Sequence, residues 1–137
     1  MTCDHDRPGR ARGCDAVTDF SPTEKANECH READARHARF LRKTQGEPLD
    51  DKDRAAVDKF RELARWYEGV DLPREPQKYV SAIRRELRMR ARLYPVWSPT
   101  GRMTAQQAEQ IAVLEEVLAD LRDEVARRDN DLFGGES

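Results

Sequence analysis

Cysteine and histidine, the side chains that most often bind zinc, concentrate in the N-terminal part of the chain. Cys3, His5, Cys14 and Cys29, with His30 next to the last of them, could supply the four ligands of a structural zinc site. Only Cys3 and His5 have the short spacing of a zinc knuckle, since Cys14 and Cys29 are far along the chain. Two hypotheses follow: a zinc-stapled N-terminus, or three unrelated free cysteines and no cofactor.

Arginines form a second group with possible chemistry. Arg84, Arg88 and Arg92 recur at every fourth position, with Arg85 beside the first of them, and this spacing places them along one side of a helix. Such a row could lie along a phosphate backbone, and aromatic residues that follow it could stack on bases. The pattern therefore predicts a contact surface for nucleic acid or for an acidic partner.

The distribution of charge bears on that choice. Segment 74–102 has eight Arg or Lys and two Glu, a net charge of +6, whereas segment 103–137 has three Arg and nine Asp or Glu, a net charge of −6. We expect the two segments to face each other and to neutralise each other in part. The alternative is a free basic face that meets phosphate or an acidic partner.

Catalysis finds little support in the sequence. His5, His30 and His37 have no serine or cysteine nucleophile in a recognisable setting, and no glycine-rich phosphate loop occurs. Paired carboxylates such as Glu115 and Glu116 fit ion pairing on the flank of a helix. We therefore predict that the protein is not an enzyme.

Large aromatic residues point to a third kind of surface. Phe60, Trp66 and Tyr67 belong to a helical stripe that starts near Asp51. Aromatic side chains on an exposed helix are common anchors for a partner protein, and a second copy of the chain could also cover them in a homodimer. The alternative is that the stripe closes the core of a three-helix arrangement.

The elements that would position these residues are helices. A capping box at Ser21 and Glu24 starts a first helix that ends near Gly46, and a second runs from about Asp51 to Gly69. Two N-terminal helices therefore occupy 21–73, after a flexible tail over 1–20. A third helix over about 77–93 should end at Pro95, because proline restricts the residue before it.

The last helix starts at Thr104 with a second capping box and is predicted to pair with the third. Steps of four and three residues separate its seam positions, which are Gln107 and the apolar residues Ile111, Leu114, Leu118, Leu121 and Val125. This is the heptad seam of a coiled coil, which needs one facing helix. We expect an antiparallel helical hairpin over 77–128, followed by a polar tail over 129–137.

Composition agrees with a small all-α bundle of about four helices. The chain has 137 residues, of which 37% are hydrophobic and 38% charged, so a core is possible but thin. No apolar run is long enough for a transmembrane helix, and the N-terminus lacks the apolar region of a secretory signal. These observations predict a cytoplasmic protein that does not enter a membrane.

The hairpin resembles a family of small uncharacterised phage and prophage proteins. The match covers about residues 80–121, and its segments are 86–90 (ELRMR), 92–97 (RLYPVW), 101–108 (GRMTAQQA) and 111–115 (IAVLE). Segment 98–100 departs from the longer apolar turn of the family, and Leu114 stands where methionine is usual. The family carries no established activity, so the resemblance implies no site residues.

That resemblance implies a phage or prophage origin and an accessory role. Small proteins of this kind bind and inhibit a host or defence protein, or assist DNA metabolism. We therefore expect a non-enzymatic accessory protein that acts by protein–protein contact with a host or phage protein. Two alternatives stay open: a nucleic-acid-binding accessory protein that uses the arginine-rich third helix, and a zinc-stapled N-terminal module.

Overall fold

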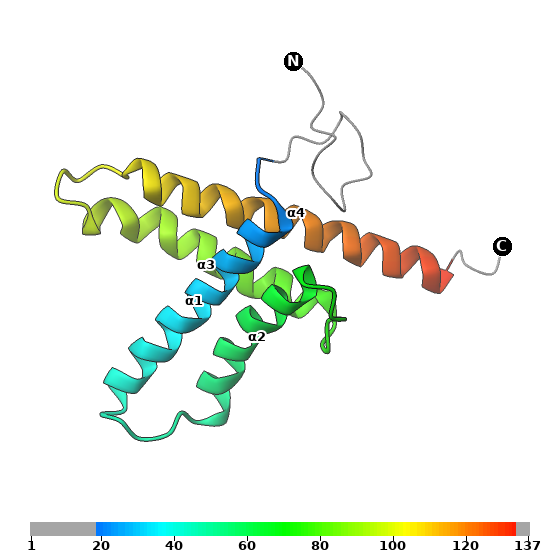
Figure 1. Ribbon diagram of the computed structural model, residues 1–137, viewed down its shortest axis with the longest axis horizontal. Helices are drawn as coiled ribbons and strands as arrows, with labels where there is room; N and C mark the ends of the chain where they lie inside the picture. The colour runs from blue at the N-terminus through cyan, green and yellow to red at the C-terminus, as the bar shows by residue number, and fades with distance from the viewer. Residues whose placement is uncertain (1–18, 134–137) are drawn as a thin grey trace, which may run out of the picture.

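The computed structural model describes residues 19–133 and contains four α-helices in that range. They are α1 (Pro22–Lys43), α2 (Asp51–Tyr67), α3 (Pro76–Trp97) and α4 (Ala105–Phe133). The helices form two hairpins, α1 with α2 and α3 with α4, which cross each other near the N-terminal end of α1 (Figure 1). The predicted all-α bundle is therefore confirmed.

Local signals in the sequence account for the helix ends in the first hairpin. The Ser21 side chain accepts a hydrogen bond from the Glu24 backbone, and the Glu24 carboxylate accepts one from the Ser21 backbone, which is the expected capping box. At the end of α2, the backbone N–H of Val70 donates to Arg65 and that of Gly69 donates to Trp66. Gly69 has a φ of 102°, so a residue without Cβ closes this turn at low cost.

The end of α3 differs from the prediction. Pro95 lies inside the last turn, and the helix continues to Trp97. Proline removes its own backbone donor and crowds the preceding turn, but the Ser98 N–H still closes the last turn by donating to the Tyr94 carbonyl at 3.1 Å. Tyr94 is also buried, which holds this turn against the bundle. The rule that a helix ends before proline describes a bias that packing overrides here.

The buried face of α4 is wider than a coiled-coil seam. Leu114 and Leu121 of the predicted seam are fully buried, but Val113 and Val117, which lie off the seam, are buried as well. The reason is that α4 packs against α1 in addition to α3. The two-helix seam is therefore replaced by a face that meets two neighbours.

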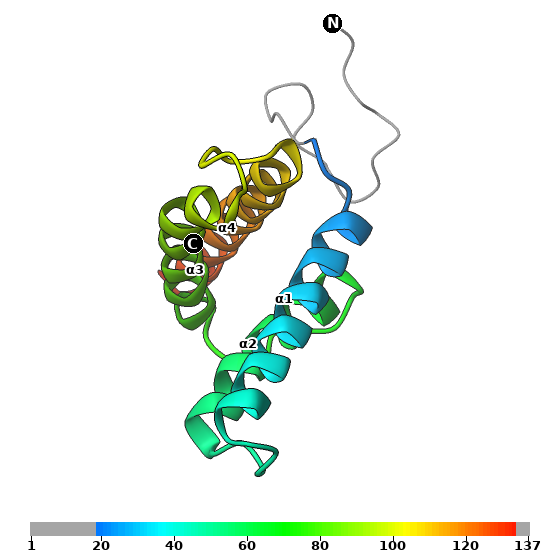
Figure 2. The ribbon, with the colours of Figure 1, turned by 90° about the vertical axis from the view of Figure 1, so that its left-hand side faces the viewer.

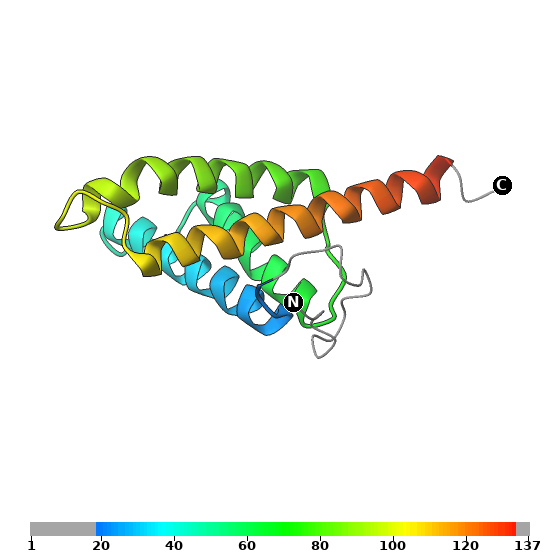
Figure 3. The ribbon, with the colours of Figure 1, turned by 90° about the horizontal axis from the view of Figure 1, so that it is seen from above.

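The C-terminal end of α4 extends beyond its partner helices. Figure 3 shows α3 and α4 side by side, with the last turns of α4 continuing past the start of α3. Within the described residues the helix continues to Phe133, beyond the predicted end of the hairpin at residue 128. Glu124 forms ion pairs with Arg127 and Arg128 on the same helix, and such pairs stabilise a helix that has few neighbours.

The core lies where the two hairpins cross. Its fully buried members come from all four helices and are Cys29, Ala33, Phe60, Leu63, Ala64, Tyr79, Ile83, Leu114, Val117 and Leu121. Beyond the crossing, the C-terminal part of α1 diverges from α3 (Figure 1), and Figure 2 shows the two hairpins next to each other. Within residues 19–133, no helix combines the length and the apolar character that a membrane crossing requires.

Candidate functional site

A cluster of six charged side chains lies between α1 and α3, next to the core. Arg90 is its centre and is only 2% exposed. Its guanidinium contacts the carboxylates of Glu32 and Glu86, each at 2.7 Å, and that of Glu28 at 2.9 Å. Arg36 bridges Glu32 and Glu86 at 2.8 and 2.6 Å, and Arg31 pairs with Glu28.

The cluster balances its charges internally. Burial alone would lower the pKa of Arg90, but the charges of Glu32 and Glu86 outweigh it and raise the pKa above its usual value. Burial would raise the pKa of Glu32, but Arg90 and Arg36 lower it below its usual value. Three guanidinium groups thus meet three carboxylates. The cluster is a structural element that ties the two hairpins together, and its charges are not available to a ligand.

A second buried ion pair joins α1 to α4. Lys25 has no exposed surface, and its Nζ lies 2.9 Å from Asp120 and 3.4 Å from Glu116. The Tyr67 hydroxyl donates to the same Asp120 carboxylate at 2.7 Å. The carboxylates on this face of α4 therefore bind a lysine of α1, and not the arginines of α3.

A groove opens where α1 and α3 diverge, and it is the candidate binding site. Its volume is about 710 Å³, within the usual range for ligand sites. We call it the α1–α3 groove and define it by four apolar residues (Phe40, Met89, Leu93 and Trp97) and three basic residues (Arg39, Lys43 and Arg85). Trp97 is 59% exposed. The buried cluster around Arg90 forms the deep end of this groove.

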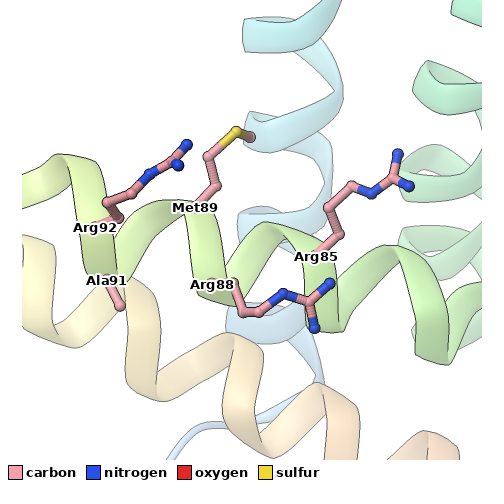
Figure 4. A pocket seen from close by; sticks show the side chains of 5 residues that line it. All are labelled: Arg85, Arg88, Met89, Ala91 and Arg92. Atoms are coloured by element: carbon pink, nitrogen blue, oxygen red, sulfur yellow. The ribbon is translucent and has the colours of Figure 1, made fainter.

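The four arginines predicted to form one contact face are exposed, and three of them lie close together on α3. Figure 4 shows the pocket that Arg85, Arg88 and Arg92 line together with Met89 and Ala91, with Met89 pointing toward α1. Arg84 lies one turn before Arg88 and so shares its side of the helix. Of the four arginines, only Arg85 also lines the α1–α3 groove.

These arginines are not neutralised by α4 in the way the charge distribution predicted. Within residues 19–133, the side chains of Arg84, Arg85, Arg88 and Arg92 form no ion pair or hydrogen bond. The positive charge of α3 thus stays at the surface, apart from that of Arg90.

The aromatic residues proposed as partner contacts belong mainly to the core. Phe60 is fully buried, and the Arg36 guanidinium covers its ring at 4.6 Å, so the prediction that it contacts a partner is wrong. Trp66 and Tyr67 are half-buried and pack against the core with their rings 5.0 Å apart. The stripe closes the core between the hairpins, which is the alternative left open above.

The zinc hypothesis loses one ligand. Cys29 is fully buried in the core, and burial raises the pKa of its thiol, whereas zinc binds the thiolate. Cys3, His5 and Cys14 lie outside the described residues. Among residues 19–133, no three metal-ligating side chains gather in one place.

Of the residues that define the α1–α3 groove, the sequence singled out Arg85 and the aromatic Trp97 that follows the arginine row, but not the other five. Phe40, Met89 and Leu93 read as ordinary apolar positions, and Arg39 and Lys43 as solvent-exposed charges. The sequence signal that could have pointed to the groove was the pair of large hydrophobic residues Val96 and Trp97, which the structure leaves exposed at the end of α3. Pro95 concealed it, since it suggested a turn at this point.

The assignment of the groove as a candidate binding site rests on its own geometry. Comparisons with known protein families, with curated proteins and with solved structures give no match for this chain.

Proposed function

We propose that this protein is a non-enzymatic binding module that holds a partner protein in the α1–α3 groove. The observation that carries the proposal is the combination of exposed Trp97 with an apolar floor and a basic rim in one groove. Large aromatic side chains next to arginines are the usual anchors of protein interfaces. The resemblance to phage and prophage proteins adds the expectation that the partner is a host or defence protein in the cytoplasm, which binding would inhibit or modulate.

Two features favour binding over catalysis. The buried charged residues near the groove, Arg90, Glu32 and Glu86, already satisfy one another at 2.7 Å, so none of them is poised to exchange a proton with a substrate. The floor of the groove is formed by aliphatic and aromatic side chains. Such a surface gains free energy when another apolar surface covers it.

The test is capture of a partner from host lysate, treated with nuclease, on immobilised wild-type protein and on two variants. Trp97→Ala removes the exposed aromatic of the groove, and Val70→Ala removes an apolar side chain that is 54% exposed outside it. We expect a stoichiometric partner on wild type and on Val70→Ala, and loss of that partner on Trp97→Ala. Equal capture by all three proteins, or loss of all captured material after nuclease treatment, would contradict the proposal.

Nucleic-acid binding is a second candidate, and the exposed arginines of α3 favour it. Arg84, Arg88 and Arg92 have no ionic partner within residues 19–133, so they could neutralise phosphates. The expected result is retention on DNA at low salt that falls steeply as salt rises and disappears when all three are changed to glutamate. Retention of partner protein by that triple variant, without retention of DNA by wild type, would exclude this candidate.

A further inference from the structure

The rim of the α1–α3 groove is positively charged on both sides. Arg39 and Lys43 are exposed on α1, and Arg85 is exposed on α3. Lys43 and Arg85 form no ion pair within residues 19–133, and Arg39 reaches Glu32 only at 3.9 Å. The field at the mouth of the groove is therefore that of cations without close counterions.

The carboxylates near the groove do not cancel this charge. Glu32 and Glu86 lie at its deep end and are each less than a tenth exposed. Both are held by Arg36 and Arg90 at 2.6 to 2.8 Å. The groove thus has a neutral deep end and a basic mouth.

The apolar floor has the length and the pattern of a site for a short helix. Met89, Leu93 and Trp97 recur at every fourth position of α3 and so form one stripe along the groove. Eight residues of helix span about 12 Å, which is roughly two turns of an opposing helix. Phe40 of α1 lines the opposite wall.

We propose that the occupant of the α1–α3 groove is an acidic amphipathic helix of the partner protein. This inference rests on the proposed function and adds the chemistry of the partner. The apolar stripe of the helix would cover Met89, Leu93 and Trp97, and Asp or Glu on its flanks would face Arg85 and Lys43. Burial of the stripe supplies affinity, while the charges supply orientation and select against basic helices.

The geometry separates this occupant from nucleic acid. Phosphates would gain little from the aliphatic floor, and they would use Arg88 as readily as Arg85 because both are exposed on the same helix. An acidic helix in the groove would meet Arg85 more closely than Arg88, since Arg85 lines the groove and Arg88 does not. Arg85→Glu and Arg88→Glu therefore form a matched pair of variants.

Fluorescence anisotropy with designed peptides of about five helical turns tests the inference. One peptide has a Leu/Phe stripe with Glu flanks, a second has the same stripe with Lys flanks, and a third has the Glu flanks with an alanine stripe. A labelled DNA duplex and a labelled single strand complete the set. We expect the first peptide to bind wild type at least about tenfold more tightly than every other probe, a difference of about 1.4 kcal/mol.

The variants then locate the site. Arg85→Glu, alone or with Lys43→Glu, should weaken binding of the Glu-flanked peptide by about tenfold, whereas Arg88→Glu should weaken it clearly less because that side chain does not line the groove. Equal binding of the Lys-flanked peptide, tighter binding of either DNA, absence of binding by the Glu-flanked peptide, or equal effects of the two single variants would overturn the inference. If lysate capture still depends on Trp97 in such a case, the proposed function stands and only the acidic-helix inference fails.

Discussion

Arg90 of α3 donates a hydrogen bond from Nη2 to the Glu32 carboxylate of α1 at 2.7 Å, across 58 positions of sequence. Both side chains are buried. The same guanidinium also donates to the backbone carbonyl of Gln110 on α4 at 2.8 Å, so one side chain connects three helices. The relative position of the two hairpins therefore depends on a buried ionic contact as well as on apolar packing.

Removal of Arg90 should be among the most destabilising changes in the chain. Arg90→Leu leaves Glu28, Glu32 and Glu86 without their central cation, and breaking a buried pair in this way costs about 3–5 kcal/mol. Urea unfolding at neutral pH measures the loss. Arg92→Leu on the same helix is the control, because Arg92 is exposed, and it should change the free energy of unfolding by no more than about 0.5 kcal/mol. Similar values for both variants would contradict the role assigned to Arg90.

Stability should fall in acid, and Glu32 should contribute to that loss. Its pKa in the folded protein lies below the usual 4.5, so the unfolded chain takes up this proton at a higher pH than the folded one. The stabilisation is therefore complete above pH 4.5 and is lost as the pH falls through the lowered pKa. Thermal unfolding over this range should show a steeper decline for wild type than for Glu32→Gln, which has nothing to protonate at this position. Parallel declines would show that Glu32 does not contribute.

Changing an aromatic residue to alanine should cost much more stability in the core than at the surface. Phe60 is fully buried, so Phe60→Ala should cost about 3–5 kcal/mol of stability. Trp97 is 59% exposed, so Trp97→Ala should leave the free energy of unfolding within about 1 kcal/mol of wild type. Chemical denaturation of the two variants measures the change in the free energy of unfolding for each. A large loss for Trp97→Ala would mean that its effect on partner capture reports folding and not contact.

Cys29 should be unreactive in the native protein. The test uses the double variant Cys3→Ser and Cys14→Ser, which leaves Cys29 as the last of three cysteines. Burial excludes reagents and raises the pKa of the thiol, and the thiolate is the reactive form. A thiol-specific chromogenic reagent should therefore label this variant only after denaturant is added. Rapid labelling under native conditions would show that the core opens around Cys29.

The helices were predictable because their ends are encoded locally. Ser21 with Glu24, and Thr104 with Gln107, form the hydrogen-bonded caps that their spacing predicted. The positions of the charged residues were not predictable in this way. Arg88 and Arg90 are two residues apart and chemically identical, yet one is exposed and the other buried, since the outcome depends on which carboxylates of α1 lie opposite.

The weak apolar stripe of the first helix has the same explanation. Lys25, Glu28, Glu32 and Arg36 follow one another at steps of three or four and face the rest of the bundle. Charged residues therefore occupy positions where a search for amphipathic helices expects apolar ones. For the same reason the groove was missed, because its basic rim and its apolar floor come from helices far apart in sequence.

The charges buried between the hairpins also affect how this protein can change over generations. A substitution at residue 90 or residue 120 on the second hairpin removes a close counterion of its buried partner on α1, Glu32 or Lys25. Such changes are tolerated only together with a compensating change on the other hairpin. Among homologous chains we therefore expect positions 32 and 90, and positions 25 and 120, to vary as pairs, and hybrids that combine hairpins from distant homologues to fold poorly.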